Sequence, residues 1–169
     1  MRPWCAVALL ACAVPRGGRA SFVAIDPSVH AARLGDDYEW AVRSVPFVEL
    51  AADDDVVAAF YYRWRVLRKH VTWTGAPDGY VITEFLREVS WAGLHNTIPA
   101  AAGHHLREAR WLRNATAASD YARFWFAGTG AAPASYTSWI GHAAWALWAH
   151  AVDEQRRVCL LYTSPSPRD

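Results

Sequence analysis

The sequence predicts an all-α protein with at most one short pair of strands. In several segments apolar residues recur every three or four positions, which is the spacing that lines one face of a helix. Aspartate or proline stands at the ends of several of these segments, and turns containing glycine separate others. Because such turns are short, consecutive helices are expected to lie antiparallel to one another.

The N-terminal segments begin and end at residues that cap or break helices. Residues 22–34 are predicted to be extended, with one turn of helix after Pro27. A short helix over 38–44 follows two aspartates that cap it, and Pro46 ends it.

The clearest helix is predicted over residues 56–71. Three aspartates at 53–55 precede it and suit the positive end of a helix dipole. Its apolar side chains share one stripe, which is expected to face the core: Val57, Phe60, Tyr61, Trp64, Leu67 and Val71.

The middle of the chain is predicted to be less regular. Residues 75–79 form a turn rich in Gly and Pro, and the β-prone residues 80–83 follow as a short strand or an extended segment. Residues 84–99, EFLREVSWAGLHNTIP, have no clean period and mix aromatic with polar side chains. Irregular segments of this composition often line binding sites.

Three further helices are predicted over residues 100–112, 119–126 and 135–152. Trp64 and Trp111 both fall on helical stripes, and we expect both to pack in the core.

Both ends of the chain are expected to lie outside the folded domain, which then covers residues 21–158. Residues 1–20 have the pattern of a signal peptide, with a basic start, the apolar run CAVALLACAV and small residues before the cleavage point. The protein is therefore expected to be secreted or to enter the lumen of the secretory pathway. Residues 159–169, CLLYTSPSPRD, reverse-translate to a sequence that resembles a transposase-based sequencing adapter. We interpret them as non-native, and the chain as an N-terminal fragment.

Setting both ends aside limits the classes of function. Residues 21–158 contain no cysteine, which excludes disulfides, a thiol nucleophile and Cys-ligated zinc there. They hold 13 basic and 15 acidic residues, a net charge of −2, so nucleic acid is not an expected partner. No apolar run of membrane-spanning length remains. No dinucleotide or phosphate-loop motif is present, and we expect no cofactor.

A bound metal ion is not expected either. His104, His105 and Glu108 share one helix face, but a helical metal site needs a second such unit on another helix. We interpret the pair of histidines as polar groups packed against the next helix, with one of them near a pocket.

The irregular segment holds the candidate sugar-binding residues. Trp91 has a flat apolar face and an indole N–H, which suit stacking on a sugar ring. His95 and Asn96 offer donors and acceptors for hydroxyl groups. Glu84 is a weak candidate for a catalytic acid, with Glu88 one helical turn away, and otherwise a substrate-binding or structural group.

The sequence also holds one N-glycosylation sequon, Asn114-Ala115-Thr116. A glycan at Asn114 would agree with the predicted signal peptide, because the modification takes place in the secretory pathway.

Five segments in order carry a family resemblance: YYRWRVLRKH (61–70), GYVITEFLREVSWAGLHNTI (79–98), AAGHHLREARWL (101–112), DYARFWF (120–126) and SYTSWIGHAAWA (135–146). Together they resemble the N-terminal part of the mannosylglycerate-hydrolase-like glycoside hydrolases, which are related to trehalase and processing α-glucosidase I. The resemblance runs from about Phe22 to Val152. The family tends to carry Asp where this chain has His142, and often has Pro within the segment that reads 86–88 here.

The resemblance implies a partial (α/α)6 toroid of the six-hairpin type, holding only the N-terminal helices. It implies inverting hydrolysis of O-glycosidic bonds by a carboxylic acid and a carboxylate base. Both carboxylates are expected from later parts of the toroid, so the fragment would contact a carbohydrate substrate without hydrolysing it. Trp91, His95 and Asn96 would belong to the sugar subsite, and Trp139 would add a wall.

Other interpretations remain open. The chain would then be a small all-α carbohydrate-binding module without catalysis, or a complete small enzyme in which Glu84 works with Glu88 or Glu108. A purely structural helical protein is the third alternative.

Overall fold

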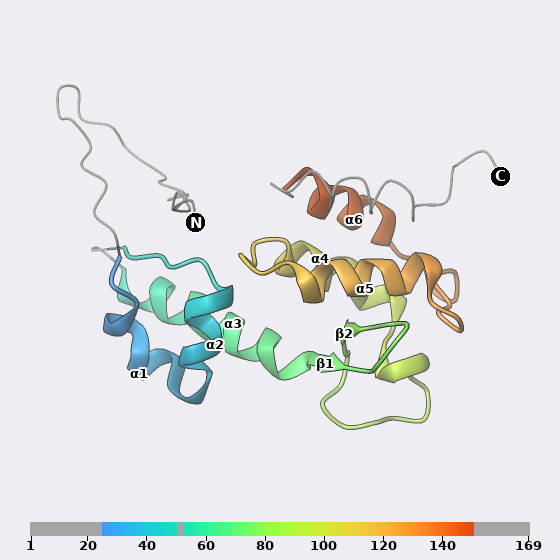
Figure 1. The fold of residues 1–169 in the computed structure, drawn as a ribbon, viewed down its shortest axis with the longest axis horizontal. Helices are drawn as coiled ribbons and strands as arrows, with labels where there is room; N and C mark the ends of the chain where they lie inside the picture. The colour runs from blue at the N-terminus through green and yellow to red at the C-terminus, as the bar shows by residue number, and fades with distance from the viewer. Residues whose placement is uncertain (1–24, 51–52, 151–169) are drawn as a thin grey trace.

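The computed structural model describes residues 25–50 and 53–150, which are mostly helical (Figure 1). The predicted signal peptide, residues 1–20, and the predicted adapter-derived residues 159–169 lie outside the described residues. The described chain is elongated, with the N-terminal helices at one end and the last three helices stacked at the other (Figure 1). The longest helix runs between the two ends.

The N-terminal end follows the sequence prediction closely. A 3-10 turn over Pro27–His30 starts where Asp26 accepts a hydrogen bond from the Ser28 amide, at 2.9 Å. The turn continues into α1 (Ala31–Leu34), and a second 3-10 turn, Gly35–Asp37, leads into α2 (Tyr38–Ser44). Helix α2 has the predicted bounds.

Helix α3 (Asp54–His70) is the longest element and confirms the predicted stripe. The Asp53 carboxylate caps it by accepting a hydrogen bond from the Val56 amide, at 3.0 Å. Four residues of the stripe are buried, namely Val57, Tyr61, Trp64 and Leu67, while Phe60 and Val71 are half-buried against the core. The stripe therefore anchors α3 to both ends of the chain.

An antiparallel hairpin, β1 (Val71–Trp73) and β2 (Tyr80–Ile82), follows α3 directly, with Val71 opposite Ile82. The all-α prediction is therefore corrected to a mostly helical fold with one hairpin. The strands form because β-branched and aromatic residues pair across them, as the Trp73 and Tyr80 rings do at 4.9 Å. The hairpin packs on the fifth helix through β2.

Three helices complete the fold: α4 (Pro99–Ala109), α5 (Thr116–Ala127) and α6 (Ile140–Ala149). Helix α4 packs against both α5 and α6. Helix α6 begins five residues later than predicted from 135, because residues 135–139 form an irregular segment. The predicted end of this helix at Val152 lies outside the described residues.

Trp111 is not a core residue, contrary to the prediction; it is 37% exposed. Helix α4 ends at Ala109, so the helical stripe that would have buried Trp111 stops before it. Its ring instead lies on the surface between the guanidinium of Arg110, at 4.7 Å, and the ring of His150, at 4.6 Å. Trp64 is buried as predicted.

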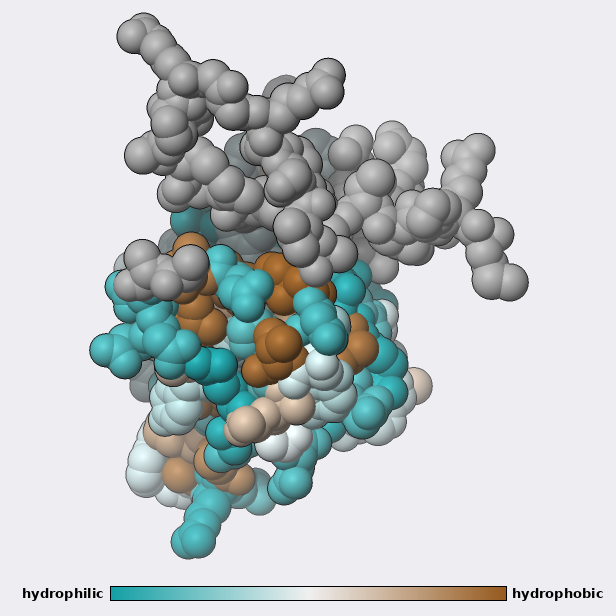
Figure 2. All heavy atoms as spheres, turned by 90° about the vertical axis from the view of Figure 1, so that its left-hand side faces the viewer, coloured by the Kyte–Doolittle hydropathy of each residue, from teal (hydrophilic) through white to brown (hydrophobic). Residues whose placement is uncertain are grey.

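The surface of the N-terminal end is largely polar. Apolar side chains on it stand apart among polar ones (Figure 2). Across the described residues, no helix is both long and apolar enough to cross a bilayer.

Candidate functional site

The segment from Glu84 to Thr97 forms a closed loop between β2 and α4. Two backbone hydrogen bonds close it: the Glu84 amide donates to the Asn96 carbonyl at 3.0 Å, and the Gly93 amide donates to the Thr97 carbonyl at 2.9 Å. His95 and Asn96 both have left-handed backbones, with φ of 55° and 59°. Non-glycine residues adopt this conformation only when the surroundings hold them there.

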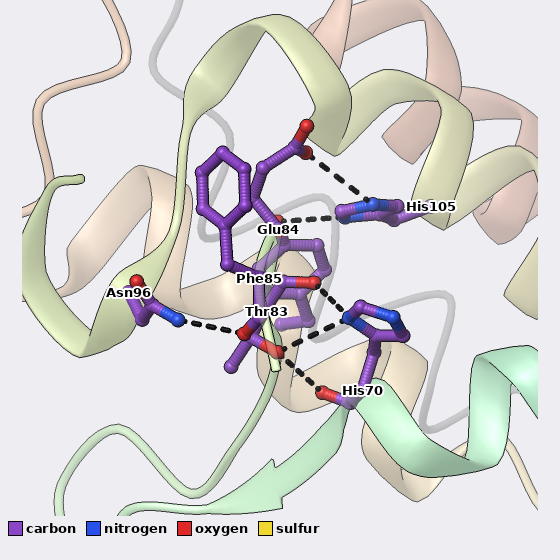
Figure 3. A network of polar contacts seen from close by, with 7 residues as sticks. His70, Thr83, Glu84, Phe85, Asn96 and His105 are labelled. Carbon is purple, nitrogen blue, oxygen red and sulfur yellow. Dashed lines mark hydrogen bonds and ion pairs between the residues drawn. The ribbon is translucent and has the colours of Figure 1, made fainter. Parts of the chain in front are cut away.

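Asn96 is the internal fastener of this loop (Figure 3). Its side-chain amide donates to the carbonyls of Phe85, at 2.6 Å, and Arg87, at 3.0 Å. Its side-chain oxygen accepts a hydrogen bond from the Val89 amide, at 3.3 Å. The predicted contact of Asn96 with a sugar stays a prediction, and it would compete with these bonds.

His95 fastens the loop to the rest of the molecule. Its Nε2 lies 2.8 Å from a carboxylate oxygen of Asp78 in the hairpin turn, and its ring lies 5.8 Å from that of Phe124 on α5. Both members of the pair are largely covered, with side-chain exposures of 26% for His95 and 13% for Asp78. The predicted hydroxyl contact of His95 is untested.

Trp91 lies at the outer part of the same loop and is 68% exposed. Its ring meets the edge of Phe85, with 6.1 Å between ring centroids. It borders an open cavity of about 240 Å³ between this loop and the segment that follows α5. The described residues that line the cavity are uncharged: Trp91, Ala92, Gly93, Leu94, Thr97, Ile98, Pro99, Trp125, Ala131, Ala132, Ser135 and Tyr136.

A polar network lies at the base of the loop (Figure 3). A Glu84 carboxylate oxygen lies 3.8 Å from Nε2 of His105 on α4. Nδ1 of His105 lies 3.3 Å from the hydroxyl of Tyr121 on α5, which is fully buried. The side chains of Glu84 and His105 are 30% and 21% exposed, so the network runs from the buried Tyr121 hydroxyl outward to the carboxylate.

Burial sets the protonation of this network. Burial, together with the nearby His70 and His104, lowers the pKa of His105 to about 4, so its ring is neutral at pH 7. Burial also raises the pKa of Tyr121 and keeps its hydroxyl protonated; the Trp125 indole opposes this and Glu84 adds to it. A protonated phenol donates to Nδ1 of a neutral imidazole, which leaves the imidazole proton on Nε2, toward Glu84.

His70 adds a second support to the strand that carries Glu84. A carbonyl oxygen only accepts, so His70 donates from Nδ1 to the Thr83 carbonyl, at 2.9 Å. The Thr83 amide in turn donates to the His70 carbonyl, also at 2.9 Å. These two bonds fix the backbone just before Glu84, so its carboxylate sits on a rigid base.

The other predicted site residues lie elsewhere. Trp139 lies against α4, with its ring 4.9 Å from His104 and 5.7 Å from the Arg107 guanidinium, and is not among the cavity-lining residues. Glu108 pairs with Arg63 of α3, and Glu88 is exposed in the loop. Within the described part of the chain, His, Cys, Asp and Glu side chains form no group of three that could hold a metal ion.

Asn114 is exposed in the turn between α4 and α5. Its side-chain oxygen accepts a hydrogen bond from the Thr116 amide, at 3.1 Å. Its glycosylation is untested and stays a prediction.

Sequence reasoning missed three residues of the site: Tyr121, Trp125 and Tyr136. Tyr121 and Trp125 are one turn apart on α5, and their spacing indicated only a buried helix face. Tyr136 was assigned to a helix that in fact begins at Ile140. A polar atom on an otherwise apolar helix face was the available signal for Tyr121, because a buried hydroxyl needs a partner.

Comparison with known proteins gives one structural relationship. No protein-family profile matches the chain, and no curated protein matches it. A solved structure described as a sialidase matches 86% of this chain with a TM-score of 0.63 and 28% sequence identity. The chain spans only 13% of the length of that sialidase chain. The protein is thus structurally similar to a small part of a glycosidase, and it is a glycoside-hydrolase-related chain.

Proposed function

We propose that this chain is the N-terminal part of a larger glycoside hydrolase and builds one wall of its sugar-binding pocket. The observation that carries the proposal is Trp91, a large apolar side chain left 68% exposed at the edge of a cavity. An exposed indole beside a cavity suits stacking on the apolar face of a sugar. The similarity to a small part of a sialidase supports the class of enzyme.

The loop that carries Trp91 supports a binding role because it is held before any ligand arrives. The Asn96 side chain and the contact between His95 and Asp78 fix its path. Fixing a loop in advance removes the ordering cost from the binding step. A loop that served only to connect β2 with α4 would not need two left-handed residues to keep its shape.

The finer assignment rests on the sequence motifs. We propose a member of the mannosylglycerate-hydrolase-like group with an (α/α)6 toroid, of which these helices form the first part. The reaction would be inverting hydrolysis of an O-glycosidic bond, with the acid and the base in the remainder of the toroid. Entry into the secretory pathway and a glycan on Asn114 belong to the same proposal.

Sugar binding by the 169-residue chain tests this function. We expect weak binding of monosaccharides, with Kd in the millimolar range, because one wall supplies only part of the contacts. Trp91→Ala should abolish the binding, while Trp73→Ala, which removes a comparably exposed indole from β1, should not. Titration followed by saturation-transfer NMR measures both. Equal binding by the native chain and Trp91→Ala would contradict the proposal.

Turnover separates this proposal from the complete small enzyme. The 169-residue chain should not release sugar from aryl glycosides, since Glu84 is proposed to contact substrate without the second carboxylate. Turnover that disappears in Glu84→Gln would instead favour the small enzyme. Tight sugar binding without turnover, retained in the absence of any further helices, would favour a binding module.

A further inference from the structure

The cavity beside Trp91 has a second aromatic rim that the sequence did not reveal. Tyr136 comes from the segment between α5 and α6, lines the same cavity and is 55% exposed. The two exposed rings therefore reach the cavity from two different segments, one before α4 and one after α5. The floor between them includes apolar atoms of Ile98, Pro99 and the buried Trp125.

The lining also lacks charge. The charged side chains of the loop, Arg87 and Glu88, are exposed and are not among the described residues that line the cavity. His95 belongs to the same loop, but it is directed to Asp78 at 2.8 Å. A carboxylate placed in this cavity would lose water without gaining a cationic partner, which disfavours an anionic ligand.

The size of the cavity limits the ligand further. Its volume of about 240 Å³ is below the roughly 300–1,000 Å³ of pockets that take drug-sized ligands. A single sugar ring is the part of a glycan that suits it. Such a ring has an apolar face of C–H groups that stacks on an aromatic side chain, while its hydroxyl groups stay toward water.

We propose that Trp91 and Tyr136 form a two-sided aromatic clamp for one uncharged pyranose ring. The inference rests on the proposed function and specifies its substrate class. It sets this chain apart from the sialidase that it resembles, because a sialic acid carries a carboxylate. Tyr136 is then a binding residue that acts through its ring, and its hydroxyl is secondary.

The test measures binding to the 169-residue chain by saturation-transfer NMR and by quenching of tryptophan fluorescence. The probes are the methyl pyranosides of glucose, mannose and galactose, and N-acetylneuraminic acid as the anionic sugar. We expect at least one neutral pyranoside to bind at least tenfold more tightly than the anionic sugar. Tyr136→Ala should weaken that binding at least tenfold, whereas Tyr136→Phe should stay within about threefold of the native chain.

A charge placed in the lining provides an independent check. Ala132→Lys introduces an ammonium group at an exposed lining position, so it should improve binding of N-acetylneuraminic acid in a salt-dependent way. Trp73→Ala, outside the cavity, should change neither affinity.

The outcomes separate the two proposals. If Trp91→Ala abolishes binding but Tyr136→Ala leaves it unchanged, the clamp is overturned and the proposed function stands. Preference of the native chain for the anionic sugar overturns the uncharged substrate class and again leaves the proposed function intact. If the native chain binds none of the probes, the proposed function fails and the clamp fails with it.

Discussion

A methyl group added at Gly103 tests how Trp139 is used. Gly103 is buried within α4, and an ideal Cβ there would lie 2.7 Å from Cε2 and 2.8 Å from Cδ2 of Trp139. Carbon atoms in good contact are about 3.5–4.0 Å apart, so the indole would have to move by about 1 Å. In Gly103→Ala the ring that packs between α4 and α6 is therefore displaced.

Two opposing effects set the magnitude. Alanine is about 1 kcal/mol better than glycine in the interior of a helix. Overpacking costs about 1–3 kcal/mol, and a displaced indole also loosens its contacts with His104 and Arg107, each worth about 0.5–1 kcal/mol. The net expectation is a loss of about 1–2 kcal/mol in the free energy of unfolding.

Urea unfolding followed by circular dichroism measures the change, and the chain offers a matched control. Gly141 is a helical glycine of α6 whose added Cβ would meet nothing within 4 Å. Gly141→Ala should therefore stabilise the chain by about 0.5–1 kcal/mol. In a Trp139→Ala background the clash at Gly103 disappears, and Gly103→Ala should become stabilising as well.

One result would refute this reasoning. If Gly103→Ala stabilises the native chain as much as Gly141→Ala does, then Trp139 does not rest on α4. Its ring would then be free for the sugar wall that the sequence predicted. A destabilisation that vanishes in the Trp139→Ala background assigns Trp139 to helix packing.

Three further predictions concern the hairpin, the loop and the polar network. Because the pKa of His105 is lowered to about 4, stability should be complete above about pH 6.5 and fall by up to about 3 kcal/mol as the pH drops toward 4. His105→Gln should flatten that slope in urea titrations between pH 4 and 8; an unchanged slope would contradict it. Asn96→Gly should cost about 2 kcal/mol through its lost hydrogen bonds, and Asn96→Ala about 1 kcal/mol more because φ is 59°; equal stability of the two variants would count against the backbone argument. Gly79→Ala should destabilise more than Gly75→Ala, since both have positive φ but only the Cβ at Gly79 would meet Asp120, at 2.5 Å; thermal unfolding ranks them, and the reverse order would refute the contact.

The helices could be predicted where their signals are local. Asp53 and Pro46 stand at helix boundaries, and the stripe of α3 repeats with the helical period, so neither needs knowledge of distant residues. The same reasoning failed for Trp111, because the spacing continues past Ala109 although the helix does not. A helix end that depends on the packing of other elements leaves no mark in the apolar period.

The candidate site could be predicted in its location but not in its directions. The mixed composition of residues 84–97 indicated an irregular segment, and Trp91 does border a cavity. The directions of His95 and Asn96 depend on left-handed backbone angles that the residue types do not dictate. The contact between His105 and Tyr121 depends on how α4 and α5 pack, which no short stretch of sequence specifies.

The roles of Asn96 and Trp91 differ because a hydrogen-bonding group is used only once. An asparagine amide has two donor protons, and in Asn96 both nitrogen-bound protons are directed to loop carbonyls. A sugar hydroxyl would have to replace one of those bonds, and exchanging one bond of about 1 kcal/mol for another gives no net affinity. The face of Trp91 carries no such prior commitment, since 68% of the residue is open to water. We therefore infer that Asn96 contributes to binding by holding the loop in place, and that direct contact energy comes from the aromatic rings.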